Sequence, residues 1–366
     1  MAVAFKVVDS SYRIGCGRYI QEEGALLHLP EEVKRLHACH AFLVADAVAM
    51  KLAGDEALAL LQSECISTEV FLYDSFCNRE EAERLQKTES FGKCDVVIGI
   101  GGGNILDFAK LCAAYAEKAV ICVATSSATC AAYTPLSVTY TSDFRCCGSI
   151  HHPREVDCVL VDMRILSRQP VRLLTAGAYD AMAKMIETEQ RLKNRMEDEI
   201  DIGVRAAYEL SRFTYKRITE DLPKAIEDCR KGKCTKAVHD IVYLSIAATG
   251  IISGMARGSN QTAIAHKIYE TSRTLFPAEV RNALHGELVA IGLIAQLAYN
   301  ADDSAGLAFR AALKRDGMPY SLCVYGLKGD ETTIDRYSEL ILASSAMAGA
   351  DETEKTRLRH SLTLLF

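Results

Sequence analysis

Residues 96–110 read VVIGIGGGNILDFAK, an apolar run that leads through a glycine-rich turn into an amphipathic segment. Val96–Ile100 predicts a buried strand, and the residues from about Asn104 to Lys118 predict a helix. Glycines between a strand and a helix let backbone N–H groups approach a phosphate, and the amino end of the helix adds about half a positive charge. A tight turn without a ligand uses the same residues, so the motif alone leaves its role open.

Short apolar runs that alternate with helical segments flank this motif on both sides. Further strands are expected at 41–45, 70–74, 119–124 and 158–162, which indicates a parallel sheet covered on both faces. After Pro170 the apolar residues recur with helical periodicity. The sequence therefore predicts an α/β domain with a Rossmann-like parallel sheet over residues 1–165 and an all-helical domain over residues 166–366, with an active cleft between them.

The composition argues against several classes of protein. The 366 residues carry a net charge of −6, which does not favour a general nucleic-acid binder or a protein of anionic membranes. No run of 18 apolar residues is present, and the amino-terminal MAVAFKVVDSSYRIG lacks the basic start and apolar run of a signal peptide. We therefore expect a cytoplasmic protein with no membrane or nucleic-acid partner.

The chain has fourteen cysteines. Most lie singly inside apolar runs such as AVICVAT and VDCVLVD, where free cysteine behaves as a small core residue, and this favours reduced, structural thiols. The pair Cys146–Cys147 lies near His151–His152, but adjacent ligands of this kind rarely close a tetrahedral metal site. This segment is interpreted as a polar hairpin.

A hydroxyl-rich loop, ATSSATCAAYTPLSVTY at 124–140, follows the strand expected at 119–124. Open α/β sheets bind ligands at the carboxyl ends of their strands. Together with GGGxxxDxAK, this loop resembles the glycerol dehydrogenase branch of the iron-containing, metal-dependent alcohol dehydrogenases. The similarity runs nearly end to end and includes GRYIQEEGAL at 17–26, LVDMRIL at 160–166 and GMPYSL at 317–322. It implies a dehydroquinate synthase-like fold, with NAD bound by the first domain and a catalytic metal by the second.

The resemblance assigns the NAD contacts by position. It places them at Gly101, Gly102, Gly103, Asn104, Asp107, Thr125, Ala128, Thr134, Leu136 and Tyr140. It also places Asp46 at the adenosine ribose, where a carboxylate accepts bonds from both hydroxyls and repels a 2′-phosphate, which favours NAD over NADP. The simpler interpretation of Asp46 is an N-cap for the helix that follows.

Asp180, His266 and His285 are the candidate metal ligands and catalytic residues. A lone histidine in an apolar helix is by default a satisfied core or surface residue, but the resemblance makes these three the ligands of the metal that activates the substrate alcohol. One carboxylate and two imidazoles, with an open fourth position, suit catalytic zinc. Iron-using relatives carry a further histidine at the position of Lys184, so Zn²⁺ is favoured over Fe²⁺.

Two residues bear on the substrate. Cys130 stands where glycerol dehydrogenases carry an aspartate, and ATCAA-(aromatic)-TPLSV with DxxAK at Lys184 resembles the hydroxycarboxylate dehydrogenases of the same superfamily. Losing a carboxylate and gaining a cation favours a 2-hydroxy or 2-oxo acid over a glycerol-type polyol. Two alternatives stay open: Lys184 pairs with Glu187 or Glu189 away from the cleft, and Cys130 is a reactive thiol. Tyr179, before Asp180, is expected to narrow the pocket.

The leading hypothesis is thus an NAD(H)-linked dehydrogenase that transfers hydride between the nicotinamide and a small secondary alcohol or ketone, and that forms a homo-oligomer. A dehydroquinate synthase-like lyase uses the same cofactor, metal and cleft, but needs many basic residues around a phosphate-bearing substrate. A non-catalytic NAD-binding relative with a decayed site is the third reading, and the intact Asp180, His266 and His285 argue against it.

Overall fold

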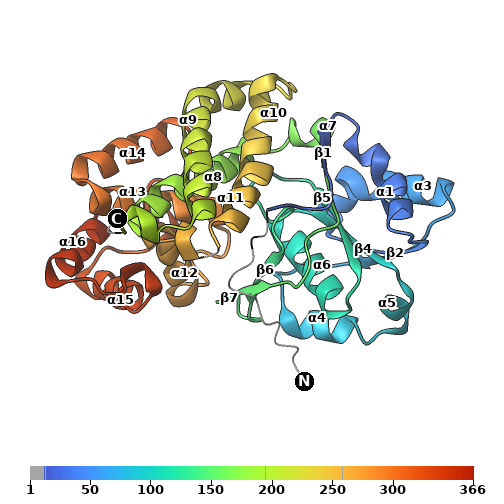
Figure 1. Cartoon of the computed structure of the whole chain (residues 1–366), viewed down its shortest axis with the longest axis horizontal. Helices are drawn as coiled ribbons and strands as arrows, with labels where there is room; N and C mark the ends of the chain where they lie inside the picture. Colours follow the sequence, from blue (N-terminus) through green and yellow to red (C-terminus); the bar gives the residue numbers. More distant parts are fainter. Residues whose placement is uncertain (1–11, 13, 194, 258) are drawn as a thin grey trace.

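The computed structural model describes residues 12, 14–193, 195–257 and 259–366 (Figure 1). The amino-terminal stretch on which the expectation of no signal peptide rests lies mostly outside the described residues. The chain forms two halves that lie side by side, one built on the sheet from the amino-terminal part and one made of helices from the carboxyl-terminal part.

A six-stranded parallel sheet organises the first half, and five of its strands were predicted from the sequence. Its strand order is β1-β8-β5-β4-β2-β3. The strands are β1 (Tyr19–Glu22), β2 (His40–Ala45), β3 (Ser67–Leu72), β4 (Val96–Gly101), β5 (Ala119–Ala124) and β8 (Cys158–Asp162). The edge strand β1 was not predicted, because its YIQE sequence lacks the apolar run of a buried strand and its residues are only partly buried.

The central strands β4 and β5 are apolar throughout because helices cover both faces of the sheet. Val97 of β4 belongs to the apolar cluster that includes Phe91 and Phe108, whereas the next residue, Ile98, belongs to the cluster that includes Leu61. The covering elements are η1 (Ala25–His28), α1 (Leu29–Arg35), α2 (Ala47–Ala49), η2 (Met50–Gly54), α3 (Asp55–Ser63), α4 (Arg79–Leu85), α5 (Glu89–Lys93) and α6 (Gly103–Tyr115).

A separate antiparallel hairpin extends from this half. It consists of β6 (Leu136–Tyr140) and β7 (Cys146–His151), with a bulge at Thr139/Tyr140. The interpretation of the Cys146–His152 segment as a polar hairpin is therefore confirmed. His152 itself is buried and its Nε2 lies 2.8 Å from the hydroxyl of Ser137.

The second half is helical after Pro170, as predicted. Its elements are α7 (Met163–Leu166), α8 (Val171–Leu192), η3 (Glu197–Glu199), α9 (Ile202–Arg230), α10 (Lys236–Tyr243), η4 (Leu244–Ala248), α11 (Thr249–Met255), η5 (Ser259–Gln261), α12 (Ile264–Leu275), α13 (His285–Asn300), α14 (Asp303–Arg315), η6 (Leu322–Tyr325), α15 (Glu331–Leu342), η7 (Ser345–Met347) and α16 (Glu352–Thr363). Helix α13 is apolar on nearly every face because α8, α12, α14 and α16 all pack against it.

One helix of the described chain, the continuous stretch Lys236–Met255, is long and apolar enough to cross a membrane by length and composition alone. Its mean hydropathy is 1.4, and 61% of the most apolar window is buried inside the fold. A core helix of a globular protein meets the same criteria, and this one packs against α8 and α9.

Gly177 in the middle of α8 allows the two halves to meet closely. A Cβ atom at this position would lie 1.8 Å from the carbonyl oxygen of Ser127, in the loop after β5. Glycine inside a helix costs up to about 1 kcal/mol relative to alanine. The close approach of a helix to a backbone carbonyl accounts for its presence here.

We expect Gly177→Ala to destabilise the protein by about 1–3 kcal/mol or more, because the clash is with backbone and no side chain is able to move away. Gly92→Ala in α5 is the matched control, since a Cβ there meets nothing within 4 Å, and alanine is expected to stabilise the helix slightly. Thermal unfolding of both variants tests this, and equal melting temperatures for Gly177→Ala and the wild type would contradict it.

Candidate active site

A deep cleft opens where the carboxyl ends of the central strands face α8, α12 and α13. Its volume is about 1140 Å³, at or above the upper end of the range of about 300–1,000 Å³ for small-molecule sites. The predicted cofactor residues that line it are Asp46, Gly102, Gly103, Asn104, Asp107, Thr125, Ala128, Thr134, Leu136 and Tyr140. The same cleft is lined by Cys130, Asp180, Lys184, His266 and His285. The structure thus brings both predicted groups of residues into one cavity.

The glycines of the turn have two roles, because Gly101 allows close packing and Gly102 and Gly103 line the cleft. Gly101 ends β4, and a Cβ there would lie 2.7 Å from the Cβ of Ile105, so glycine is needed for α6 to approach the strand. Gly102 is the N-cap of α6 and has no side chain to occupy the end of the helix. Gly102, Gly103 and the exposed Asn104 line the cleft, which leaves the amino end of the α6 dipole facing it.

Asp46 caps α2, so the simpler interpretation of this residue holds. Its Oδ1 accepts hydrogen bonds from the backbone N–H groups of Val48, at 2.9 Å, and Ala49, at 2.7 Å. Both bonds use the same oxygen, and the partly buried residue also lines the cleft. Capping and a ribose contact through Oδ2 are therefore compatible.

Asp107 and Lys110, on the first turns of α6, hold the hydroxyl-rich loop in place. The buried ammonium of Lys110 lies 2.9 Å from Oδ1 of Asp107 and donates to the carbonyl oxygens of Ala131, at 2.6 Å, and Thr134, at 2.9 Å. Oδ2 of Asp107 accepts from the N–H of Val138 at 3.0 Å. Asp107 thus positions the loop that follows Cys130, a role that the sequence alone did not reveal.

Three side chains from three helices converge at the other end of the cleft. Oδ1 of Asp180, on α8, lies 3.6 Å from Nε2 of His266, on α12, and 3.3 Å from Nε2 of His285, the first residue of α13. One donor atom of each residue lies within 4.8 Å of the others. This is the spacing that a single metal ion requires of three ligands.

The surroundings of Asp180 fit a metal ion. Its Oδ1 is buried and accepts no hydrogen bond from the described residues, and a buried unsatisfied carboxylate oxygen is costly unless a cation meets it. Burial by itself raises the pKa of this carboxyl, but His285, Lys184 and His266 together lower that pKa below its ordinary value. The carboxylate is therefore ionised and available as a ligand.

Glu187, one helical turn after Lys184 on α8, orients His266. Its carboxylate accepts from Nδ1 of His266, from the N–H of His266 at 2.9 Å and from the N–H of Ala263 at 2.6 Å. Because the carboxylate only accepts, Nδ1 is the donor in this bond, and Nε2 is the ring nitrogen that faces Asp180. Carboxylate–histidine–metal arrangements of this kind fix the tautomer of a ligating histidine. From its position in the sequence, Glu187 was expected only as a partner for Lys184, and this role was missed.

Lys184 faces the cleft, which answers the alternative in which it points away. It is buried, and its Nζ lies 3.5 Å from Nε2 of His266. Cys130 lies in the same cavity and is partly buried. Burial raises the pKa of the Cys130 thiol to about 11, against the opposing effect of the Lys184 cation. Cys130 therefore lines the cavity with an uncharged thiol at physiological pH.

The expectation that Tyr179 narrows the pocket is wrong. Its hydroxyl donates to Asp316 at 2.7 Å and its ring packs edge-on against Phe309 of α14, and it is not among the described residues that line the cleft. Consecutive helical residues point about 100° apart, so Asp180 faces the cleft while Tyr179 faces α14. Sequence position next to a ligand therefore misled the prediction.

Two further residues at the cleft carried no signal in the sequence. Tyr269 donates or accepts a hydrogen bond of 2.7 Å with the hydroxyl of Tyr140, and its ring lies 4.2 Å from that of His285. Gln261 is buried, lines the cleft and has an Oε1 without a hydrogen-bond partner among the described residues. Both are placed by helix packing that links residues distant in sequence.

Comparisons with known proteins show the family of the chain. Residues 16–163 match the model of the family described as iron-containing alcohol dehydrogenase. A glycerol dehydrogenase of Thermotoga maritima is 34% identical over 284 residues, which cover 77% of this chain and 75% of that protein. The chain belongs to the iron-containing alcohol dehydrogenase family. It is accordingly an oxidoreductase that acts on CH–OH donors, of the glycerol dehydrogenase-like, metal-dependent type.

Two other relatives extend the comparison. Hydroxycarboxylate dehydrogenase A of Escherichia coli is 29% identical over 255 residues, which cover 69% of this chain and 68% of that protein. The crystal structure of a probable glycerol dehydrogenase from Sinorhizobium meliloti superposes with a TM-score of 0.81 at 24% identity and covers 97% of each chain. That likeness confirms the α/β-plus-helical fold.

We expect Asp180→Ala and His285→Ala each to lose bound metal and dehydrogenase activity together. Removing a ligand should lower metal affinity by more than the roughly 10–100-fold that is typical of an outer-shell partner. Metal content by atomic emission and steady-state rates measure the two effects. His360→Ala, an exposed histidine on α16, is the matched control, and retention of metal and activity in either ligand variant would refute the assignment.

The raised pKa of Cys130 predicts that its thiol resists alkylation at pH 7. Because the thiolate is the nucleophile, its labelling rate should rise about tenfold per pH unit below pH 11. Iodoacetamide labelling with peptide mapping measures this, and the exposed Cys323 provides an internal reference. Rapid labelling of Cys130 at pH 7 would instead identify it as a reactive thiol.

Proposed function

We propose that the protein is an NAD(H)-linked, zinc-dependent dehydrogenase that interconverts a small 2-hydroxy acid and the corresponding 2-oxo acid. The observation that carries the proposal is the position of Lys184, whose ammonium lies in the cavity beside Asp180 and His266. A cation at this point provides a partner for a substrate carboxylate next to the carbon that reacts.

NAD is the proposed cofactor because of the two polar features at the sheet end of the cleft. The amino end of α6, formed by Gly102 and Gly103, provides N–H groups for a pyrophosphate. Asp46 keeps one carboxylate oxygen for the adenosine ribose and repels a 2′-phosphate, which favours NAD over NADP.

Zinc is the proposed metal because Asp180, His266 and His285 supply three ligands and Lys184 supplies none. The bound ion provides Lewis-acid chemistry that lowers the pKa of a substrate hydroxyl. Within the protein, the carboxylate of Glu187 accepts from Nδ1 of His266 and turns Nε2 of that ring toward Asp180. His285 is held at the start of α13 against the ring of Tyr269.

Cys130 and Lys184 together favour a substrate that carries a carboxylate. Cys130 puts a neutral thiol where glycerol dehydrogenases carry an aspartate, and so removes a negative charge that accepts polyol hydroxyls and repels an acid. Lys184 adds a positive charge in the same cavity. The relative named hydroxycarboxylate dehydrogenase A supports this choice.

A glycerol-type polyol is the second candidate, supported by the relatives named glycerol dehydrogenase. Both candidates are dehydrogenase reactions, and the names of the relatives favour them over a dehydroquinate synthase-like lyase. The converging ligands around an unsatisfied Asp180 favour a working enzyme over a non-catalytic NAD-binding relative.

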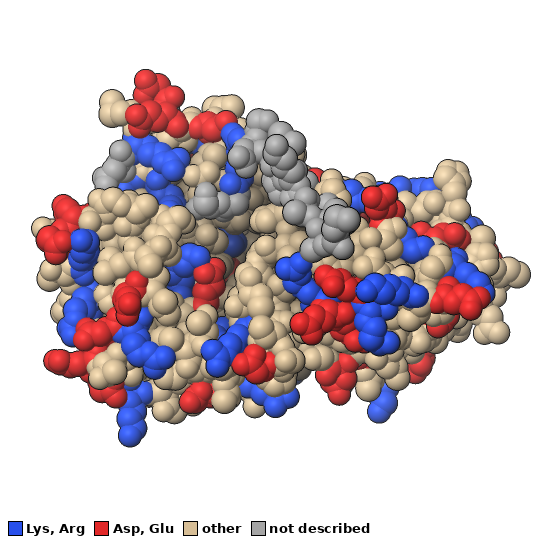
Figure 2. All heavy atoms as spheres, turned by 90° about the horizontal axis from the view of Figure 1, so that it is seen from below, with Lys and Arg blue, Asp and Glu red and all other residues tan. Residues whose placement is uncertain are grey.

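The proposal includes a cytoplasmic homo-oligomer without nucleic-acid or membrane partners. Figure 2 shows acidic and basic side chains interspersed over the visible face, in keeping with the modest net charge of −6. A face of this kind offers no extended field of one sign for a polyanion.

A substrate panel of glycerol, 1,2-diols, 2-hydroxy acids and 2-oxo acids, with NAD and NADP, tests the proposal. We expect the acids to have the highest kcat/KM with NAD. Lys184→Met keeps the length of the side chain and should lower kcat/KM for a 2-oxo acid by about 10–100-fold, the worth of a charged hydrogen bond, with a smaller effect on diols.

Cys130→Asp is the reciprocal variant, and it should shift the ratio of kcat/KM values toward glycerol. Cys323→Ser, far from the cleft in sequence and exposed, should leave that ratio unchanged. A wild-type enzyme that oxidises glycerol well and ignores 2-oxo acids would overturn the choice of substrate.

A further inference from the structure

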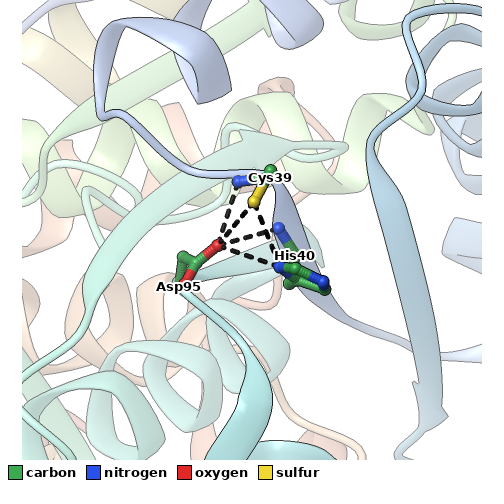
Figure 3. Close-up of side chains that lie close together, drawn as sticks. All are labelled: Cys39, His40 and Asp95. Atoms are coloured by element: carbon green, nitrogen blue, oxygen red, sulfur yellow. Dashed lines mark hydrogen bonds and ion pairs between the residues drawn. The ribbon is translucent and has the colours of Figure 1, made fainter.

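Cys39, His40 and Asp95 form a second cluster of potential metal ligands, on the surface and away from the cleft. Figure 3 shows the three side chains close together, with His40 as the first residue of β2, Cys39 directly before it and Asp95 directly before β4. All three residues are exposed. In the described chain, this cluster and Asp180–His266–His285 are the two groups of three such side chains close enough to share an ion.

Two of the three distances in the cluster match those of a tetrahedral site, and the third, between sulfur and nitrogen, is about 0.5 Å shorter. Sγ of Cys39 lies 3.1 Å from Nδ1 of His40 and 3.5 Å from Oδ2 of Asp95, and the latter two atoms lie 3.4 Å apart. Zinc bonds of about 2.3 Å to sulfur and about 2.0–2.2 Å to nitrogen and oxygen place the donors of a tetrahedron about 3.3–3.6 Å apart. Little movement is needed to bring all three atoms onto one ion.

The sheet holds the three residues in this arrangement. β2 and β4 are adjacent parallel strands, with Ala41 opposite Val96, so their amino ends lie together. The N–H of Asp95 donates to the carbonyl oxygen of His40 at 2.7 Å. Oδ2 of Asp95 accepts from the N–H groups of Cys39 and His40, each at 2.9 Å. The backbone of Cys39 and His40 therefore fixes the position of the Asp95 carboxylate.

The cluster is separate from the active site. His40 begins β2 and Asp46 follows its other end, and six residues of strand span about 20 Å. The cluster therefore lies at the amino edge of the sheet, whereas the cleft opens at the carboxyl edge.

We propose that Cys39, His40 and Asp95 form a second binding site for a thiophilic divalent cation such as Zn²⁺, completed by water. Adjacent residues alone rarely close a tetrahedral site, but here the third ligand, Asp95, comes from the neighbouring strand segment before β4. Binding exchanges the thiol proton of Cys39 for the metal and releases that proton to solvent. A thiolate, an imidazole and a carboxylate suit zinc and cobalt, and do not suit magnesium or calcium, which take oxygen ligands. The ion cross-links the starts of β2 and β4.

Titration of the metal-free protein with Co²⁺ distinguishes the two sites. The active-site set has no sulfur ligand, so the near-ultraviolet absorption of a thiolate-to-cobalt charge transfer reports the Cys39 site alone. We expect two Co²⁺ ions per chain and this absorption in the wild type. Cys39→Ser should bind one ion, lose the charge-transfer absorption and keep its dehydrogenase activity.

Two further variants sharpen the experiment. His40→Ala keeps the sulfur but removes one ligand, and its Kd for Co²⁺ at this site should rise at least tenfold. Cys65→Ser, which changes an exposed cysteine of the same half, and Cys130→Ser, which changes the thiol of the cleft, should keep both ions and the absorption. A wild type without the charge-transfer absorption, or a Cys39→Ser variant that retains it, shows a hydrogen-bonded cluster only and overturns the proposal.

Discussion

The geometry of the cleft depends on the contacts that the buried ammonium of Lys110 makes with surrounding oxygen atoms. A cation with almost no solvent exposure is stable only if oxygen atoms surround it, and here these are the carboxylate of Asp107 and the carbonyl oxygens of Ala131, Thr134 and Leu136. Meeting this requirement draws the hydroxyl-rich loop onto the first turns of α6. The loop in turn carries Cys130 toward the proposed metal ligands, and Gly177 lets α8 close against it.

At the other end of the cleft, the charges around the carboxylate of Asp180 decide which side chains are left to face the cavity. Asp180 is buried with an unsatisfied oxygen, and the cations and imidazoles around it keep it ionised. Glu187 adds a second buried carboxylate, which accepts hydrogen bonds from His266 and Ala263. Lys184 is thus left facing the cavity, where its charge is available to a substrate. A neutral Cys130 does not cancel that charge.

Much of the architecture followed from local patterns. The strands β5 and β8 have the predicted bounds, because each is a continuous apolar run between helical segments. The glycine turn and the helix after it were also predicted, as was the helical second half. β1 was missed, because a partly buried edge strand has no apolar run. Tyr179 was misjudged, because adjacency in sequence does not fix which side of a helix a residue faces.

The sequence by itself determined most of the strands and helices and the glycine turn, because periodicity and motif spacing are properties of neighbouring residues. The residues of the metal set came from its resemblance to a known family. Only the tertiary structure decided which atoms meet. Asp180, His266 and His285 come from three helices separated by as many as 105 residues, and the roles of Glu187, Lys110 and the Cys39–His40–Asp95 cluster depend on contacts between distant segments. Such contacts arise from packing and from satisfying buried charges, and both act across the whole chain.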